Sequence, residues 1–216
     1  MRSDRLAFAA AATFLCLVLV SGCREQQPST ADAVPERFAG VRKQAASPAT
    51  AQSSFCEKSY PPGGEGARRY AAPPQRPLPG STDGGSSAGS SGSAWTWVNL
   101  WATWCTPCVE EMELLGRWRE GFSRDGTLVS FEFVSIDEDA EREKDLVAWR
   151  SKGLPGPIRW LRSERDLGPL LDSLGVERGA MIPIHALVDA SGWLRCVRVG
   201  AIHEQDYAAV KGFLAR

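Results

Sequence analysis

The second half of the chain alternates between short apolar runs and amphipathic ones. The runs "WTWVNLW" (95–101) and "GTLVSFEFVSID" (126–137) are apolar on both faces, which predicts central strands of a parallel sheet. Residues 107–120 carry apolar side chains at helical spacing and predict a helix between these strands. Residues 139–153 predict a second, amphipathic helix that Gly153 closes.

Shorter segments complete this pattern towards the C-terminus. They are, in order, a short strand (158–163), a short helix (166–174), a hairpin (182–189 and 193–200) around a Gly-containing turn, and a closing helix (203–216). The order βαβα, then α, then ββα predicts an α/β fold with a central mixed sheet covered by helices on both faces.

The N-terminus has the pattern of an export signal. Two arginines precede the 15-residue apolar run from Leu6 to Val20, which suits a signal peptide better than a membrane span. The following Ser-Gly-Cys23 resembles the lipobox of bacterial lipoproteins, so residues 1–22 are the expected signal peptide and Cys23 the expected lipidation site. The expected location is the cell envelope, with the protein anchored by lipid in the membrane and facing the periplasm or the extracytoplasmic space. An ordinary secreted protein is the alternative.

Two polar regions separate this signal from the regular pattern. Residues 23–55 are rich in Ala, Pro, Ser and Gln and predict a flexible tether. Residues 56–94 show no clear period and end in a Gly/Ser-rich insert, which predicts an irregular N-terminal region. The folded domain is therefore expected at 95–216. The formal net charge of −1 gives no indication of a nucleic-acid partner.

The chemistry is concentrated in the pair Cys105 and Cys108, placed after a predicted strand and at the start of a predicted helix. A helix N-terminus stabilises a thiolate, which predicts an exposed nucleophile at Cys105 and a more buried resolving thiol at Cys108. A zinc half-site or a static bridge are the alternatives. Zinc would need two more ligands from Cys56, Cys196 and the two histidines, and none of these stands at ligand spacing. We expect no metal and no cofactor other than the redox-active Cys105–Cys108 pair.

The segment "LWATWCTPCVEEM" resembles the active-site segment of the TlpA/ResA-like thiol-disulfide oxidoreductases, membrane-tethered members of the thioredoxin superfamily. Residues 174–202 resemble that family's second signature, and the similarity spans 95–216. The resemblance implies a thioredoxin-like fold and a protein-disulfide reductase. It also implies protein substrates with disulfides, a membrane electron donor of the thiol-disulfide relay type, and often a role in cytochrome c maturation.

The resemblance also implies roles for individual residues. Pro183 matches the family's cis-proline, and the backbone of Ile182 beside it would pair with an extended substrate segment. A trans proline at a strand edge is the alternative. Glu111 matches an acid that tunes the thiols or relays a proton, although it lies in an acidic cluster that also suits a solvated helix surface. Trp104 would shield the thiols and dock substrates, whereas Trp101 suits packing.

The chain departs from the family pattern at several positions. Leu100 replaces the usual Phe, and Glu113 replaces a common helix Pro, which predicts a straighter helix. Asn99 stands where thioredoxin itself has a buried acid, which makes Glu111 the candidate acid. His185 occupies a position where small Thr-type residues are typical, so it either alters the electrostatics near Cys105 or points into the sheet.

The two remaining cysteines, Cys56 and Cys196, predict a structural disulfide that ties the irregular region to the domain. The alternative is two separate thiols, with Cys196 as a small buried hydrophobic residue. Two other functions also remain open at this point. One is a non-catalytic binding or chaperone module on the same fold, and the other is a thiol peroxidase.

Overall fold

The computed structural model describes residues 55–80 and 92–216. The predicted signal peptide, the lipidation site Cys23, nearly all of the tether and most of the Gly/Ser-rich insert lie outside these residues. The predictions made for those segments stay predictions.

The fold is built on one mixed sheet with β4 (Trp95–Trp101) at its centre. β4 runs parallel to β5 (Val129–Ser135) and antiparallel to β7 (Ile184–Asp189). The sheet order is β1-β8-β7-β4-β5-β6-β3, and β2 also pairs with β8. The outer strands are β6 (Ile158–Leu161), β8 (Trp193–Val199), β1 (Lys58–Ser59), β2 (Arg68–Arg69) and β3 (Gln75–Arg76).

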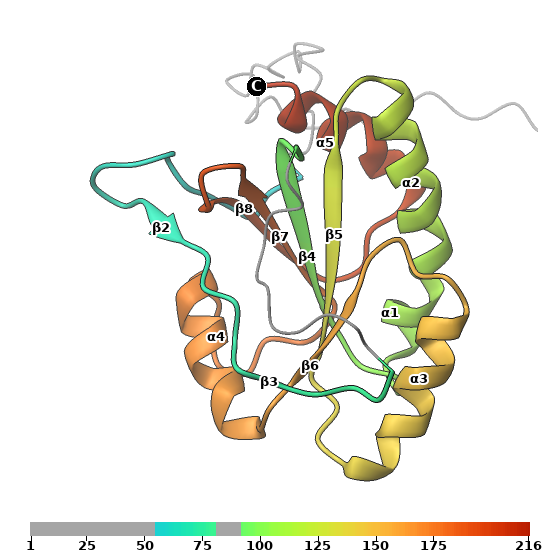
Figure 1. Cartoon of the computed structure of the whole chain (residues 1–216). Helices are drawn as coiled ribbons and strands as arrows, with labels where there is room; N and C mark the ends of the chain where they lie inside the picture. The colour runs from blue at the N-terminus through green and yellow to red at the C-terminus, as the bar shows by residue number, and fades with distance from the viewer. Residues whose placement is uncertain (1–54, 81–91) are drawn as a thin grey trace, which may run out of the picture. The chain divides into compact units, whose positions relative to one another are not determined.

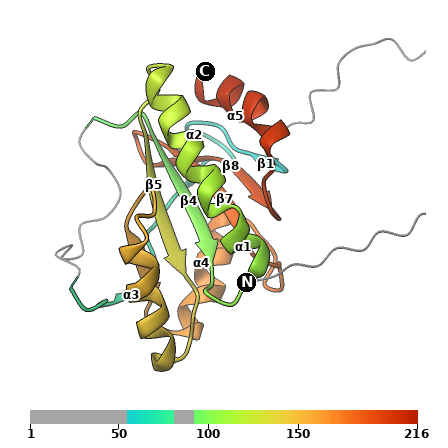
Figure 2. The same ribbon diagram turned by 90° about the vertical axis from the view of Figure 1, so that its right-hand side faces the viewer.

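Helices cover both faces of this sheet. They are α1 (Thr106–Glu110), α2 (Met112–Arg124), α3 (Glu143–Ser151), α4 (Leu167–Leu174) and α5 (Tyr207–Leu214), with short 3-10 turns before the last three. Figures 1 and 2 show α2, α3 and α5 on one face and α4 on the other. The α/β architecture expected from the sequence, a central mixed sheet covered by helices on both faces, is therefore confirmed.

Every residue of β4 is buried, which explains why this strand is apolar on both faces. Trp97 and Trp101 point into the core beneath α2, α3 and α5, whereas Val98 and Leu100 join the core beneath α4. The ring of Trp97 stacks on Phe131 at a centroid distance of 5.4 Å. Successive side chains of β4 thus point alternately into two hydrophobic clusters, one on each face of the sheet.

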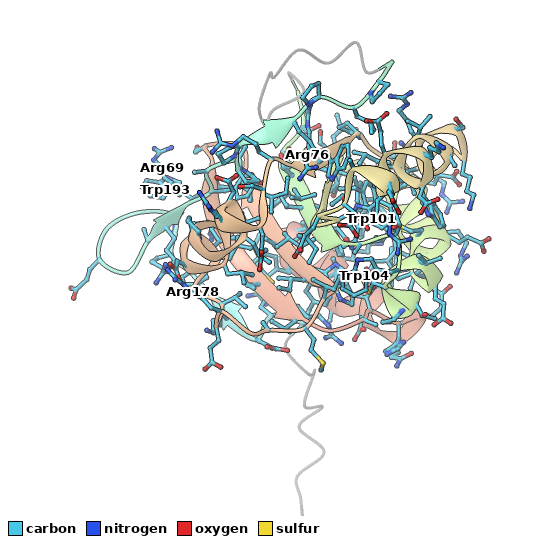
Figure 3. The ribbon with its side chains drawn as sticks, turned by 90° about the horizontal axis from the view of Figure 1, so that it is seen from below. Arg69, Arg76, Trp101, Trp104, Arg178 and Trp193 are labelled. Atoms are coloured by element: carbon cyan, nitrogen blue, oxygen red, sulfur yellow. A yellow bond between two sulfur atoms is a disulfide. The ribbon has the colours of Figure 1, made fainter. Side chains whose placement is uncertain are left out.

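The sheet extends beyond the predicted domain at 95–216. Strands β1 and β2 pair with β8, and β3 pairs with β6, so residues 58–76 belong to the same sheet. Arg69 lies over the Trp193 ring at 4.1 Å, and Figure 3 shows the two side by side. These strands have two residues each and their side chains are not buried, so they leave no period in the sequence.

The prediction of a straighter helix over 107–120 was wrong. The helix divides at Glu111, which separates α1 from α2. Glu111 has φ −82° and ψ −9°, and its side chain is only 3% exposed. At this junction the carboxylate turns inward and bonds to Asn99 in β4 instead of joining the solvated helix surface.

Candidate functional site

The two cysteines of the motif form a disulfide at the start of α1, with their Cα atoms 5.3 Å apart. Cys105 is the N-cap residue, and its sulfur accepts a hydrogen bond of 3.3 Å from the backbone N–H of Cys108. The same N–H can stabilise a Cys105 thiolate after reduction. Pro107 sits in the first turn, where a missing N–H costs little.

The turn before Cys105 is held by a residue that sequence reasoning missed. Asp137 follows the end of β5, is 1% exposed, and accepts hydrogen bonds from both the N–H and the hydroxyl of Thr103. Its Oδ2 also accepts from the Ser135 hydroxyl at 2.7 Å. Asp137 therefore fixes the loop from which Cys105 is presented. In the sequence, the signal for this role was an acidic residue placed directly after an apolar run.

The second signature meets the first at the dithiol. The Ile182–Pro183 peptide bond is cis, as the family resemblance implied. The Ile182 carbonyl oxygen lies 3.8 Å from the Cys105 sulfur, although 77 residues separate the two in sequence. Cys105 and Ile182 thus border the same pocket, and the buried Pro183 follows directly after Ile182.

An apolar pocket of about 390 Å³ opens beside Cys105. Its lining is uncharged throughout: Trp104, Cys105, Thr106, Pro107, Ile136, Ala180, Met181 and Ile182. Trp104 and Met181 are 58% and 81% exposed, which is unusual for large apolar side chains. Figure 3 views the molecule from below, with Trp104 and Trp101 labelled. Trp101 is fully buried in the core, as expected for a packing residue.

Glu111 ends in a buried polar cluster behind the dithiol. Its Oε1 accepts a hydrogen bond of 2.7 Å from the Asn99 side-chain amide, and its Oε2 accepts one of 3.2 Å from the Ile202 backbone. His185 Nε2 lies 3.4 Å from the same Oε2. The structure therefore brings together Glu111, Asn99 and His185, which the sequence singled out separately. Glu111 itself lies three residues after Cys108.

Cys56 and Cys196 form the second disulfide of the described chain, with a Cα–Cα distance of 5.3 Å. The pairing agrees with the prediction from the cysteine count. Cys196 is fully buried in β8, and Cys56 is 6% exposed just before β1. Neither residue lines the pocket at Cys105, so this bridge joins the N-terminal segment to the sheet and stands apart from the dithiol.

A second buried ionic group lies on the α4 side of the sheet. Glu132 in β5 and Arg159 in β6 form an ion pair at 3.3 Å. Burial raises the pKa of the Glu132 carboxyl, and Arg159 offsets part of that rise. Burial, together with the charge of Glu132, also raises the pKa of the Tyr70 phenol. This group contributes to packing between the strands and does not reach the pocket lining.

Within residues 55–80 and 92–216, no helix is long and apolar enough to cross a membrane. Within the same described residues, no group of three or more His, Cys, Asp or Glu side chains is gathered in a way that could hold a metal ion.

No family model and no curated protein matches the chain. Several solved structures are similar to it. A thioredoxin-related protein from Neisseria meningitidis serogroup B is 19% identical, with a TM-score of 0.48 over 60% of this chain and 91% of that one. The thioredoxin domain of a thiol-disulfide oxidoreductase from Bacteroides vulgatus is 20% identical, with a TM-score of 0.44 over 56% and 80%. StoA from Bacillus subtilis is 17% identical, with a TM-score of 0.41 over 59% and 86%.

Proposed function

We propose that this protein is an extracytoplasmic thiol-disulfide oxidoreductase that reduces disulfides of protein substrates. The observation that carries the proposal is the position of the Cys105–Cys108 disulfide against the Ile182 carbonyl, at the mouth of an apolar pocket. A static bridge would not need an open pocket with an exposed Trp and Met beside its sulfur.

The proposed cycle starts from the reduced pair. The Cys105 thiolate attacks one sulfur of a substrate disulfide and releases the other substrate sulfur as a thiolate. Cys108 then loses its proton and attacks the Cys105 sulfur of the mixed disulfide. The Cys105–Cys108 bond forms, the bond from Cys105 to the substrate breaks, and the second substrate sulfur leaves as a thiolate, which takes a proton from water. Glu111, three residues after Cys108, accepts the Cys108 proton in this scheme.

The reducing direction follows the family resemblance and is supported by the pocket. Strong oxidants of this class stabilise their reduced thiolate. The side chains lining the pocket at Cys105 are all uncharged, so they offer a thiolate no cation. We propose that a membrane electron donor then re-reduces the pair. As substrates, we propose proteins such as cytochromes c, whose haem-binding cysteines must be kept reduced.

The test of the proposed chemistry uses the full chain, purified in detergent, with a disulfide-bonded protein substrate. C105S should reduce turnover to the uncatalysed rate, because it removes the nucleophile. C108S should accumulate a mixed disulfide with the substrate, because the resolving thiol is missing. The exposed S151A variant serves as the control and should match the wild type. Full turnover by C105S would reject the proposal, whereas wild-type turnover at the uncatalysed rate would favour a binding module.

Anchoring at Cys23 is proposed from the lipobox resemblance. Membrane fractions should retain the wild-type protein and lose a C23A variant, because a stable anchor requires the lipid chains. Equal retention of both proteins would contradict lipidation at this residue.

A further inference from the structure

The cluster behind the dithiol contains a histidine whose hydrogen-bond partners fix its protonation state. His185 is fully buried in β7, two residues after the cis-proline, and pairs in register with Asn99 of β4. The indole Nε1 of Trp97 lies 3.2 Å from its Nδ1. An indole N–H can only donate, so Nδ1 must be the accepting, unprotonated nitrogen. Turning the ring over would place a carbon against this donor and lose the bond.

A second donor reaches the same nitrogen. The amide nitrogen of Asn99 lies 3.4 Å from His185 Nδ1 and donates at 2.7 Å to Glu111 Oε1. The opposite amide orientation would place the Asn99 oxygen against the Glu111 carboxylate, which is repulsive. Asn99 therefore directs one N–H to the histidine and one to the acid. With two donors facing Nδ1, the ring proton stands on Nε2.

Nε2 is the atom that faces Glu111. It lies 3.4 Å from Oε2, at the distance of an ion pair but outside hydrogen-bond geometry in the oxidised state. An imidazolium would need a proton on Nδ1 as well, directly opposite the Trp97 N–H. The neighbour of Glu111 is therefore a neutral imidazole that offers an N–H dipole and no positive charge.

The remaining charged groups around the cluster are accounted for within the described chain. Arg198 of β8 is the register partner of His185, and its guanidinium lies 3.4 Å from the Asp206 carboxylate. Trp97 and Asn99 from β4 carry no charge, and Ile202 contributes a backbone N–H. The dithiol itself is the titratable group presented by α1. Glu111 thus receives dipoles from its bonded neighbours, whereas the cation of Arg198 is directed to Asp206.

We propose that His185 is a positioning residue for the resolving step. Trp97 locks it as the neutral Nε2–H form, and this form directs an N–H dipole at the Glu111 carboxylate without adding a positive charge. A carboxylate held in this way stays able to take the proton of Cys108 when Cys108 attacks the mixed disulfide, since active-site contacts can tighten during the reaction. The inference rests on the proposed function, and it assigns a role to one of the residues at which the chain departs from the pattern of the family it resembles.

The first test observes the histidine directly. The chain has only two histidines, so the full chain labelled with ¹⁵N-histidine gives two imidazole signals, and H203Q assigns them. We expect His185 to be the neutral Nε2–H imidazole at pH 7, in the oxidised and the reduced protein. A doubly protonated His185 at that pH, or the Nδ1–H form, would overturn the proposal.

The second test measures the resolving step alone. Reduced full chain reacts with an aromatic disulfide that forms a chromophoric mixed disulfide on Cys105, and the attack of Cys108 then releases the chromophore. Without an N–H facing it, a carboxylate holds its proton more tightly. In H185L the pH of half-maximal resolving rate should therefore move upward, with roughly a three- to tenfold slower rate below the wild-type half-point, as expected for one lost interaction with a charged group. H185Q retains a side-chain N–H and should remain within about twofold of the wild type.

The variant E111Q makes the test specific. If His185 acts through Glu111, H185L should change the pH profile of the wild type but add nothing to that of E111Q. An unchanged pH profile in both H185L and H185Q, or an equal shift in the E111Q background, would show a purely structural histidine and overturn the proposal. The histidine spectra keep the test decisive even if H185L fails to fold. Failure of the proposed function would look different, as normal chromophore release with no turnover of protein disulfides.

Discussion

At the scale of single residues, the structure separates the two cysteines of the motif. Cys105 is only 5% exposed, so the prediction of an exposed nucleophile was wrong, but this residue lines the pocket, whereas Cys108 is fully buried in the core. A bulky protein disulfide can approach only the sulfur that borders the pocket. This asymmetry is the physical basis for assigning attack to Cys105 and resolution to Cys108 in the proposed cycle.

Trp104 provides a prediction at the same scale. Its side chain is 58% exposed at the pocket, and covering such an aromatic surface contributes about 1.5–3 kcal/mol. W104A should therefore raise KM for a protein substrate by roughly ten- to a hundredfold. Its rate with a small disulfide should stay within about twofold of wild type, because a small molecule covers little of the ring.

The matched control for Trp104 is Leu128, which is 51% exposed just before β5 and lines a different pocket. L128A should leave both reactions unchanged, as measured by steady-state kinetics with the two substrates. Equal KM values for W104A and wild type on the protein substrate would remove Trp104 from the docking surface.

The sequence predicted the residues of the site better than their contacts. Spacing and resemblance identified Cys105, Cys108 and Pro183, because their chemistry is encoded in short motifs. Thr103 donates a hydrogen bond to Asp137, which lies 34 positions away in sequence. Trp97 donates one to His185, which lies 88 positions away. Such contacts depend on the register between strands. A shift by any even number of positions keeps every side chain on the same face, so the apolar pattern does not determine this register.

At the scale of elements, the burial of side chains explains which strands and helix ends the sequence predicted and which it missed. Long strands such as β4 bury every side chain and therefore leave a clear apolar run. Strands β1 and β2 hold two residues each and expose both, so their pairing with β8 comes from the tertiary structure alone. The break at Glu111 was missed because a helical period continues on both sides of a junction where one buried carboxylate turns inward.

The ion pair between β5 and β6 gives a prediction for stability against pH. Burial raises the pKa of Glu132 above its usual 4.5, so the native state holds a proton that the unfolded chain has released. Stability therefore falls as pH rises through the window above 4.5. R159M removes the cation that limits this effect, so its stability should fall more steeply, with a loss of about 3 kcal/mol relative to wild type at pH 7.

Urea unfolding at pH 5 and pH 7 measures this difference. The control is R142M, which removes an exposed ion pair with Asp145 and should change stability by less than about 1 kcal/mol at either pH. Parallel pH dependences for R159M and wild type would show that Arg159 does not limit the protonation of Glu132.

At the scale of the whole described chain, the segment that carries Cys56 and β1 is joined to the sheet that carries the dithiol. The Cys56–Cys196 disulfide links residues 140 positions apart, and β1 pairs beside it with the strand that carries Cys196. The same sheet places β7, with its cis-proline at one end, next to β4, which leads into the dithiol. The geometry at Cys105 therefore depends on strands drawn from the whole described chain.

The direction of electron flow is also a property of the whole molecule, because it compares the folded dithiol with the folded disulfide. The uncharged pocket offers the Cys105 thiolate no cation, which favours the oxidised pair. We expect a reduction potential near that of thioredoxin, about −270 mV, or lower. Equilibration of the full chain with dithiothreitol buffers, followed by counting of the Cys105 and Cys108 thiols, measures it. A value near that of strong oxidants, about −120 mV, would mean that the protein inserts disulfides and that the proposed direction is reversed.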